Sequence, residues 1–249
     1  MAFSGHTLTY VMHGAAPISR ETKTAMLDWW GPVLTEYWGT SEAGTFTTIS
    51  AADWVAHPGS VGRALPGIDI TAVDEQGRAL PAGSIGTLYC RVGTNPRPFR
   101  YHNDPTKTDG AYLAPGVLTM GDMGRVEPDG FVYLADRATN MIISGGVNIY
   151  PAEVEQALGA HPAVADVAVF GIPDDEWGEQ VKAVVELAPG HERSDDLARE
   201  LVTFVRDRLA HFKAPKTIDF ADALPRDPSG KLAIRTLKDP YWQGRERRI

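Results

Sequence analysis

The sequence of residues 7–38, TLTYVMHGAAPISRETKTAMLDWWGPVLTEYW, decides the fold class. Apolar side chains dominate two stretches of strand length, residues 7–13 and residues 33–38, and a mostly polar stretch of helix length lies between them. Ser19 can cap that helix, and Gly31 can end it. A strand, a helix and a strand joined by short connections predict a parallel α/β unit.

The loops that follow the two predicted strands are the places where a parallel sheet binds ligands, beyond the carboxyl ends of its strands. Gly14, Ala15 and Ala16 follow the first strand, and residues 39–42 follow the second. We therefore expect both loops to lie in one ligand-binding crevice.

From about residue 59 the pattern changes to short strands and turns. Residues 67–80, 86–92 and 126–136 alternate apolar and polar side chains around Gln-Gly and Asp-Gly turns, which predicts an antiparallel, barrel-like β segment. The remainder predicts a separate small α+β domain, with two helices and two strands between them. The helices are expected at residues 148–162 and 194–212, and the strands at residues 163–172 and 181–188.

The composition is that of an ordinary globular protein, with 249 residues of which 43% are hydrophobic and 22% charged. A formal net charge of −8 argues against a broad nucleic-acid footprint. No apolar run is long enough to span a membrane, and the start lacks the basic head and apolar stretch of a signal peptide. Cys90 is the single cysteine, which excludes an internal disulfide. We expect a cytoplasmic protein with no nucleic-acid partner and no membrane span.

The stretch EYWGTSEAG, residues 36–44, places chemistry-bearing side chains directly after the second predicted strand. Trp38 could stack on a planar base. Thr40 or Ser41 could hydrogen-bond a phosphate, and Glu42 could hold Mg²⁺. A capped strand-to-loop turn would explain the same residues without any ligand.

Three later segments carry further candidates. Asp122 follows a glycine in LTMGDMGRVEPDGF and can accept two hydrogen bonds from a vicinal diol. Arg137 offers a planar fork for oxygens, and residues 144–146, Ser-Gly-Gly, allow an extended ligand to approach the backbone closely. Lys231 can stabilise negative charge growing on a phosphate or carboxylate. The structural alternatives are a turn aspartate, a surface ion pair, a glycine turn and a solvated lysine after the β-turn of residues 227–230.

Taken in order, these segments resemble the core motifs of the adenylate-forming superfamily, which comprises acyl- and aryl-CoA synthetases, peptide-synthetase adenylation domains and luciferases. SGGVNIYPAEVEQAL, HPAVADVAVFGIPDDEWGEQVKAVV and LPRDPSGKL resemble the acyl-CoA synthetase branch in particular, and the tail RTLKDPYWQGRERRI resembles actinobacterial fatty-acyl or steroid-side-chain CoA ligases. The resemblance implies the end of a large α/β domain in residues 1–136, with an α/β part (1–58) and a β-rich part (59–136). A small mobile α+β domain, residues 137–249, would follow.

The resemblance also implies ATP, Mg²⁺ and coenzyme A as cofactors and a carboxylic acid, such as a fatty acid or a steroid side-chain acid, as substrate. The residues that match nucleotide-binding positions are Gly14, Ala15, Ala16, Trp38, Gly39, Ser41, Asp122 and Arg137. The residues that match catalytic positions are Thr40, Glu42 and Lys231. The residues that match coenzyme A contacts are Ser144, Gly145, Gly146, Trp177, Phe212 and Lys213.

Within these sets the resemblance implies individual roles. Trp38, usually a tyrosine in the family, would pack on adenine, Asp122 and Arg137 would bind the ribose, and Glu42 would hold Mg²⁺. Lys231 would bridge the carboxylate and the α-phosphate while the acyl-adenylate forms. Residues 144–146 would line the pantetheine tunnel after the small domain rotates.

Three features depart from the family pattern. The phosphate-binding loop, a Ser/Thr/Gly-rich run before Pro-Lys-Gly, should lie well upstream of Trp38, and none of the 37 preceding residues resembles it. Thr139 stands at the hinge, where relatives usually carry Asp or Lys, and Ala214 stands where some relatives use Arg against the CoA phosphate.

We interpret the chain as the C-terminal portion of an ATP-dependent acyl-CoA synthetase, with little or no activity alone. Two alternatives stay open. One is a non-catalytic interaction module that docks a partner chain, either a missing N-terminal half or a second copy. The other is an adenylation domain that loads a carrier protein.

Overall fold

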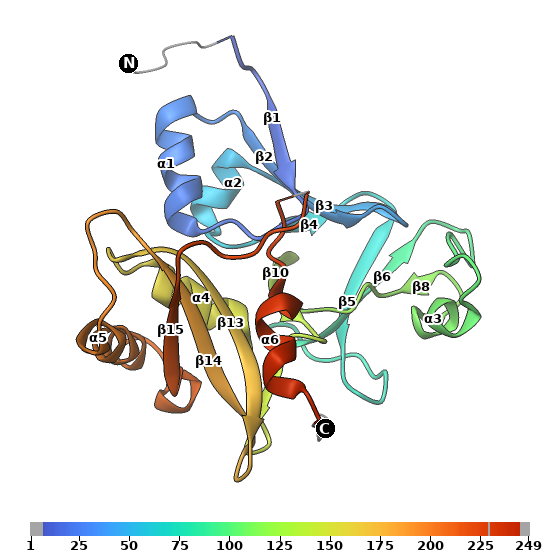
Figure 1. Ribbon diagram of the computed structural model, residues 1–249. Helices are drawn as coiled ribbons and strands as arrows, with labels where there is room; N and C mark the ends of the chain where they lie inside the picture. Colours follow the sequence, from blue (N-terminus) through green and yellow to red (C-terminus); the bar gives the residue numbers. More distant parts are fainter. Residues whose placement is uncertain (1–6, 229, 245–249) are drawn as a thin grey trace. The chain divides into compact units, whose positions relative to one another are not determined.

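The computed structural model describes residues 7–228 and 230–244, which fall into two compact units that meet at the bond between Ala138 and Thr139 (Figure 1). This division lies two residues after the boundary expected from the sequence. Each unit has its own sheet and its own hydrophobic core.

The first unit is built on a ten-stranded sheet with three helices. Its elements in chain order are β1 (Val11–Gly14), α1 (Arg20–Trp30), β2 (Leu34–Thr40), β3 (Gly44–Ser50), α2 (Ala51–Ala56), β4 (Gly62–Ala64), β5 (Ile68–Val73), β6 (Gly86–Val92), α3 (Pro105–Gly110), β7 (Tyr112–Ala114), β8 (Val117–Leu118), β9 (Asp122–Val126) and β10 (Phe131–Arg137). Strand pairing follows the order β1-β2-β3-β4-β10-β9-β6-β8-β7, with β5 added to β6.

The predicted parallel unit is confirmed, because β1 pairs in parallel with β2 and α1 connects them. Ser19 caps α1, its hydroxyl oxygen accepting a hydrogen bond from the backbone N–H of Thr22 at 3.0 Å. The expected strand over residues 7–13 is wrong for residues 7–10, since β1 begins only at Val11. Among the described strands, β1 ends the pairing order and pairs with β2 alone, so its first residues have less support from neighbouring strands than a central strand has.

The β-rich part of the first unit is antiparallel, as the sequence predicts. The pairing order has two ends, β1 and β7, so the described strands form no closed barrel. The α/β part and the β-rich part belong to one sheet, because β3 pairs with β4 and β4 pairs with β10. The strand β3 itself was not anticipated.

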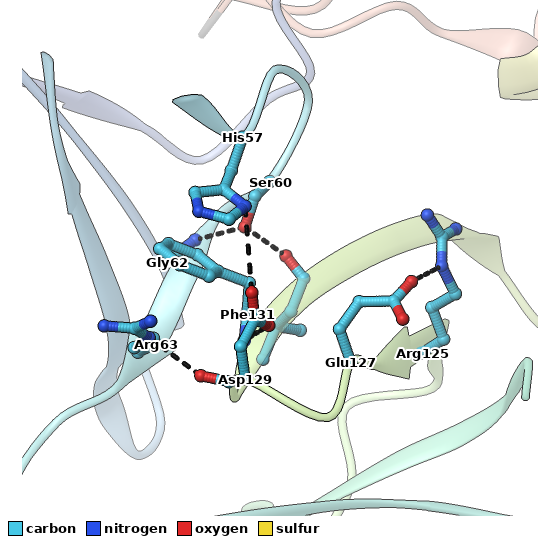
Figure 2. Close-up of polar contacts among 9 residues, drawn as sticks. His57, Ser60, Gly62, Arg63, Arg125, Glu127, Asp129 and Phe131 are labelled. Atoms are coloured by element: carbon cyan, nitrogen blue, oxygen red, sulfur yellow. Dashed lines mark hydrogen bonds and ion pairs between the residues drawn. The ribbon is translucent and has the colours of Figure 1, made fainter. Parts of the chain in front are cut away.

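Polar contacts around β4 fix this junction (Figure 2). The Ser60 hydroxyl donates to the carbonyl oxygen of Val132 at 2.8 Å and accepts from the backbone N–H of Gly62 at 3.0 Å. The Arg63 side chain donates to the carbonyl oxygen of Asp129 at 2.9 Å. Gly62 has φ +98°, and a Cβ there would lie 2.0 Å from a carbonyl oxygen of β3, so the close approach of β4 requires glycine.

The second unit has a five-stranded sheet with helices on both faces (Figure 1). Its elements are β11 (Ile142–Ser144), β12 (Val147–Ile149), α4 (Pro151–Gly159), β13 (Val164–Asp174), β14 (Gly178–Leu187), α5 (Asp195–Arg206), a 3₁₀ turn (His211–Lys213), β15 (Thr217–Ala221) and α6 (Ile234–Trp242). The order is β12-β11-β14-β13, and β15 pairs in parallel with residues 182–186 of β14, on the edge opposite β13.

Alternation along β13 explains how this sheet is covered. Val167 and Val169 face the core that α4 and α5 close, whereas Ala168 and Phe170 face the core that α6 covers. The two helices and two long strands expected from the sequence are present, but both helices are shorter than expected, because residues 148 and 149 belong to β12 and α5 ends at Arg206. Ser194 caps α5. The short strands β11, β12 and β15 and the helix α6 were not anticipated.

No helix in the described part of the chain has both the length and the apolar character needed to cross a bilayer.

Candidate functional site

Asp122 is the centre of the candidate site in the first unit. It is the first residue of β9, and its direct cross-strand partner on β10 is Arg137. Gly121, immediately before it, has φ +80°, and the backbone N–H of Ala138 donates to the Gly121 carbonyl at 2.8 Å. The turn into β9 therefore needs glycine and holds the Asp122 backbone in place.

Two side chains contact the Asp122 carboxylate. The indole N–H of Trp38, from β2, donates to Oδ2 at 2.8 Å. The guanidinium Nε of Arg137 lies 3.6 Å from Oδ1, which is an ion pair rather than a close hydrogen bond. Segments far apart in the sequence thus converge on one carboxylate, as the sequence predicts for a shared nucleotide site.

Burial dominates the electrostatics of this carboxylate. Its side chain is only 15% exposed, and burial raises the pKa of Asp122 above its usual range. The hydrogen bond from Trp38 and the charge of Arg137 oppose that rise in pKa, while the neighbouring Asp136 adds to it. Burial deprives the ionised carboxylate of hydrogen bonds from water. Hydrogen bonds from ligand hydroxyls would replace them and stabilise the ionised form, so Asp122 is suited to accept such bonds.

Glu42 lies in the hairpin turn between β2 and β3. The Thr40 hydroxyl accepts from the backbone N–H of Ala43 at 3.1 Å, which closes the turn and leaves Ser41 and Glu42 exposed. Gly39 sits at a register shift where a Cβ would lie 2.4 Å from a β3 carbonyl oxygen, so this position also requires glycine. This is the capped strand-to-loop turn that would explain these residues without any ligand, and the exposed Glu42 carboxylate remains available to a ligand.

Tyr101 is a site residue that the sequence did not reveal. Its hydroxyl lies 3.4 Å from Oε1 of Glu42, at the long limit of a hydrogen bond. Burial and the neighbouring Glu42 carboxylate raise the pKa of Tyr101, and the positive charge of Arg137 lowers it. Tyr101 therefore lies within electrostatic range of both Glu42 and Arg137. A single tyrosine in a Pro-rich loop carries no motif that could have identified it.

The loop after β1 begins at the level of Tyr37 in β2. Gly14 pairs with Tyr37 across the parallel strands, and a Cβ on Gly14 would lie 2.5 Å from the Tyr37 carbonyl oxygen. Ala15 has φ +70°, a left-handed conformation that is uncommon for a residue with a side chain. The structure therefore places Gly14 beside Tyr37, the residue directly before Trp38 and Gly39.

A buried charge cluster lies on β1, α1 and β2, close to these segments. Lys23 on α1 is completely buried, and its ammonium group donates to Oε2 of Glu36 on β2 and lies 4.8 Å from the Trp54 ring centre. His13, directly before Gly14, pairs with Glu36 across the strands. Burial and, second, the charge of Lys23 lower the pKa of His13. No sequence signal distinguished this lysine from a solvated one.

The second unit groups the predicted glycine loop with Trp177. Gly145 and Gly146, with φ +59° and +77°, form the two-residue turn of the hairpin made by β11 and β12. The backbone N–H of Gly145 donates to the Trp177 carbonyl at 2.8 Å, and a Cβ on Gly145 would lie 2.5 Å from the Trp177 ring. Ser144 ends β11 and pairs with Gly178. Trp177 is 47% exposed and forms one wall beside the loop.

The other predicted coenzyme A contacts lie on the 3₁₀ turn. Lys213 forms an ion pair with Glu153 on α4, with Nζ 2.8 and 2.7 Å from the two carboxylate oxygens. Phe212 is 54% exposed. Among the described contacts none joins this turn to residues 144–146.

Lys231 follows a tight turn. Its backbone N–H donates to Oδ1 of Asp227 at 3.0 Å, and the backbone N–H of Asp227 donates to the Lys231 carbonyl at 2.8 Å. Ser229, which the sequence places in this turn, lies outside the described residues, as do residues 245–249 of the tail. Lys231 is exposed, and so is Thr139, the predicted hinge, which is the first residue of the second unit.

Comparison with known proteins identifies the class. The family model of the AMP-binding enzyme matches residues 2–95, and the model of the AMP-binding enzyme C-terminal domain matches residues 153–231. The chain belongs to this family of adenylate-forming enzymes, whose similar members include acyl-CoA and fatty acid ligases.

Individual relatives agree with this membership. The fatty acid–[acyl-carrier-protein] ligase ScoC of Streptomyces coeruleorubidus is 37% identical over 98% of this chain and 46% of its own length. The long-chain-fatty-acid–CoA ligase of Bacillus subtilis is 37% identical over 91% of this chain and 40% of its own. The ATP-bound RpMatB-BxBclM chimera B1 has a TM-score of 0.85 with 34% identity, over 95% of this chain and 46% of that one.

A fourth similar protein was solved in complex with an acyl-adenylate. The o-succinylbenzoate CoA synthetase of Bacillus subtilis, solved with its acyl-adenylate intermediate, has a TM-score of 0.82 with 28% identity over the whole of this chain and 49% of its own. The present chain therefore spans about half the length of the relatives it matches.

Proposed function

We propose that this chain forms the C-terminal half of an acid–thiol ligase that makes acyl-CoA from a carboxylic acid, ATP and coenzyme A. The observation that carries the proposal is the convergence of Trp38 and Arg137 on the Asp122 carboxylate, with Glu42 in the turn that follows the strand of Trp38, in a chain of the AMP-binding family. Such a cluster suits a nucleotide, because it offers a diol acceptor and a cation next to an exposed carboxylate.

In the first step a carboxylate oxygen of the acid attacks the α-phosphorus of ATP, and pyrophosphate leaves. Asp122 and Arg137 bind the ribose, and the backbone of residues 14–16 borders the reacting groups. Lys231 neutralises the charge that develops between the carboxylate and the α-phosphate. A single positive charge on a flexible stem suits that task.

Glu42 fits a role toward Mg²⁺. Within the described part of the chain no group of three or more acidic, histidine or cysteine side chains could form a complete cage for a metal ion. An exposed lone carboxylate matches the way Mg²⁺ is held in nucleotide sites, where phosphates and waters supply the remaining ligands. When bound there, Mg²⁺ would screen the phosphate charge, and Tyr101 would orient the Glu42 carboxylate.

In the second step the thiol of coenzyme A loses its proton to solvent, its sulfur attacks the acyl carbonyl, and AMP leaves. The Gly145–Gly146 hairpin and Trp177 would line the path of the extended pantetheine arm, because a backbone without side chains permits close approach. Phe212 and Lys213 would contact the nucleotide end of coenzyme A. Rotation of the second unit at Thr139 would exchange Lys231 for the hairpin between the two steps.

The half that is needed for the grip on the β- and γ-phosphates would come from further polypeptide, either in the same chain or in another. Several large apolar side chains at the edge of the first unit support this part of the proposal. Tyr10, Met12 and Trp29 are 58%, 47% and 49% exposed, and the only fully buried residue of α1 is Lys23. Exposed apolar surface of this kind, at a sheet edge with one free side, normally marks an interface.

The acid substrate belongs to the class that the relatives' names indicate. That class includes fatty acids and, in a Rhodococcus jostii relative that is 38% identical, a propanoyl group carried on a 7a-methyl-1,5-dioxo-octahydro-1H-indene ring system. A carrier protein is a second candidate acceptor, because ScoC is named as a ligase for an acyl-carrier protein. Offering free coenzyme A and a carrier protein in parallel reactions would separate the two acceptors.

Pyrophosphate release tests the proposal. The purified chain, with ATP, Mg²⁺ and a panel of medium- and long-chain fatty acids, should release no pyrophosphate above background. Adding the first half of a relative, such as the long-chain ligase of Bacillus subtilis, should restore release and acyl-CoA formation, and the Lys231→Ala variant should not. Release by the chain alone would contradict the need for a second half, and a chain that stays monomeric without binding a hydrophobic dye would contradict the interface.

A further inference from the structure

We infer that Trp38 is a positioning residue: its indole N–H fixes the Asp122 carboxylate in the orientation that accepts the two hydroxyls of a ribose. The inference rests on the proposed function, because it concerns the nucleotide site of that function. It assigns Trp38 a different role from stacking on the adenine ring.

The contact itself is close and long-range in sequence. The Trp38 Nε1 atom lies 2.8 Å from Oδ2 of Asp122, and 84 positions separate the two residues. An indole N–H can only donate, and a carboxylate can only accept, so the polarity of the contact is unambiguous. A hydrogen bond to an ionised group in a partly buried setting is among the stronger ones in proteins.

The ring of Trp38 is held by packing. The residue is 8% exposed and lies in the core cluster with Phe46, whose ring centre is 5.1 Å away in an edge-to-face arrangement. A ring so enclosed has little surface to offer a planar ligand. It can, however, hold its N–H in a fixed direction, because the surrounding core leaves it few other orientations.

The Asp122 carboxylate keeps capacity for a ligand. Each of its oxygens can accept two hydrogen bonds, and Trp38 occupies one position on Oδ2. Oδ1 faces Arg137 at 3.6 Å, too far for a close hydrogen bond. With the backbone fixed by the glycine turn at Gly121 and one oxygen fixed by Trp38, the free lone pairs point in a defined direction. A vicinal diol requires such a pair of aligned acceptor positions.

Nucleotide analogues test this inference. We would measure the affinities of the 249-residue chain for Mg·ATP and Mg·3′-deoxy-ATP by calorimetry, in the wild type, in Trp38→Phe and in Phe46→Leu. The wild type should prefer ATP by about tenfold or more, since a hydrogen bond to a charged group is involved. Trp38→Phe keeps an aromatic ring but removes the donor, and should reduce the preference to about twofold or less.

Phe46→Leu is the matched control, because it disturbs the same core cluster without touching the carboxylate. Because it keeps the indole donor but removes one ring contact of Trp38, it should weaken the preference for ATP over the deoxy analogue less than Trp38→Phe does. Equal loss of preference in both variants would mean that packing alone matters, and an unchanged preference in Trp38→Phe would overturn the inference.

A second readout needs no nucleotide. In ¹⁵N-labelled chain the Trp38 indole N–H signal should shift upfield in Asp122→Ala and should follow the titration of the Asp122 carboxyl, whereas the Trp54 indole signal should not. A Trp38 signal that ignores the Asp122→Ala substitution would overturn the positioning role itself. If the wild type binds neither nucleotide, the proposed function fails, and so does the part of the inference that concerns the ribose diol. The indole signal would still test the contact between Trp38 and Asp122.

Discussion

The buried pair of Lys23 and Glu36 offers a prediction whose size follows from the structure. Lys23 is completely buried and Glu36 is 8% exposed, so removing one partner leaves the other charge in the protein interior. Breaking a buried pair in this way typically costs about 3–5 kcal/mol. Glu36→Gln should therefore lower the free energy of unfolding of the first unit by about 3 kcal/mol or more.

Two further variants separate charge from packing. The double replacement Lys23→Met with Glu36→Met removes both charges at similar volume, and should be close to neutral or stabilising. Arg78→Gln breaks the surface pair with Asp74, in which the arginine side chain is 74% exposed, and should change stability by less than about 1 kcal/mol.

Urea unfolding followed by tryptophan fluorescence measures these changes, because four of the six tryptophans lie in the first unit. The two units can unfold separately, so the transition of the first unit is fitted on its own. A loss under about 1 kcal/mol in Glu36→Gln, or a double variant as unstable as the single one, would refute the view that an uncompensated buried charge is the cause.

Three other predictions concern single sites. The pKa of His13 is lowered from 6.5 in the folded chain, so the unfolded chain binds the His13 proton more readily. The free energy of unfolding should therefore fall as the pH drops below about 6.5. Urea titrations at several pH values should show a weaker pH dependence in His13→Gln. The pKa of Asp122 is raised in the folded chain, so the folded state holds this proton more tightly than the unfolded state, and stability should fall as the pH rises through the titration of Asp122. Asp122→Asn should therefore raise the melting temperature at pH 7 while weakening ATP binding. A lower melting temperature would contradict this. Gly145→Ala should destabilise the second unit by at least about 1 kcal/mol, because φ is +59° and the new Cβ would meet the Trp177 ring at 2.5 Å; a neutral thermal shift would count against a rigid hairpin.

Local signals in the sequence were enough to predict the parts of the fold that depend on neighbouring residues. Ser19 caps the start of α1 and Gly31 ends it, and Ser194 caps the start of α5. The sequence shows these boundaries because capping acts within a single turn. Three-residue strands such as β11 and β12 escaped prediction, since so short a stretch has no measurable alternation. The start of β1 was placed too early because edge position, which only the pairing order reveals, decides where pairing begins.

The candidate site was predicted as a set of positions, but its internal contacts were not. The motifs predicted that the segments of Trp38, Asp122 and Arg137 come together, and they do. The direction of the Trp38 side chain could not be predicted, because it depends on packing against residues far away in the sequence. Lys23 escaped for a related reason: lysine is almost always solvated, and only the partner supplied by β2 makes its burial possible.

We propose above that the first unit holds half of a nucleotide site built around Asp122. Calorimetric titration of Mg·ATP into the wild-type chain and into Asp122→Ala tests it most directly. We predict measurable binding to the wild type and its loss in Asp122→Ala, because the carboxylate is the acceptor for the ribose. Equal binding by both chains, or binding by neither, would contradict the claim.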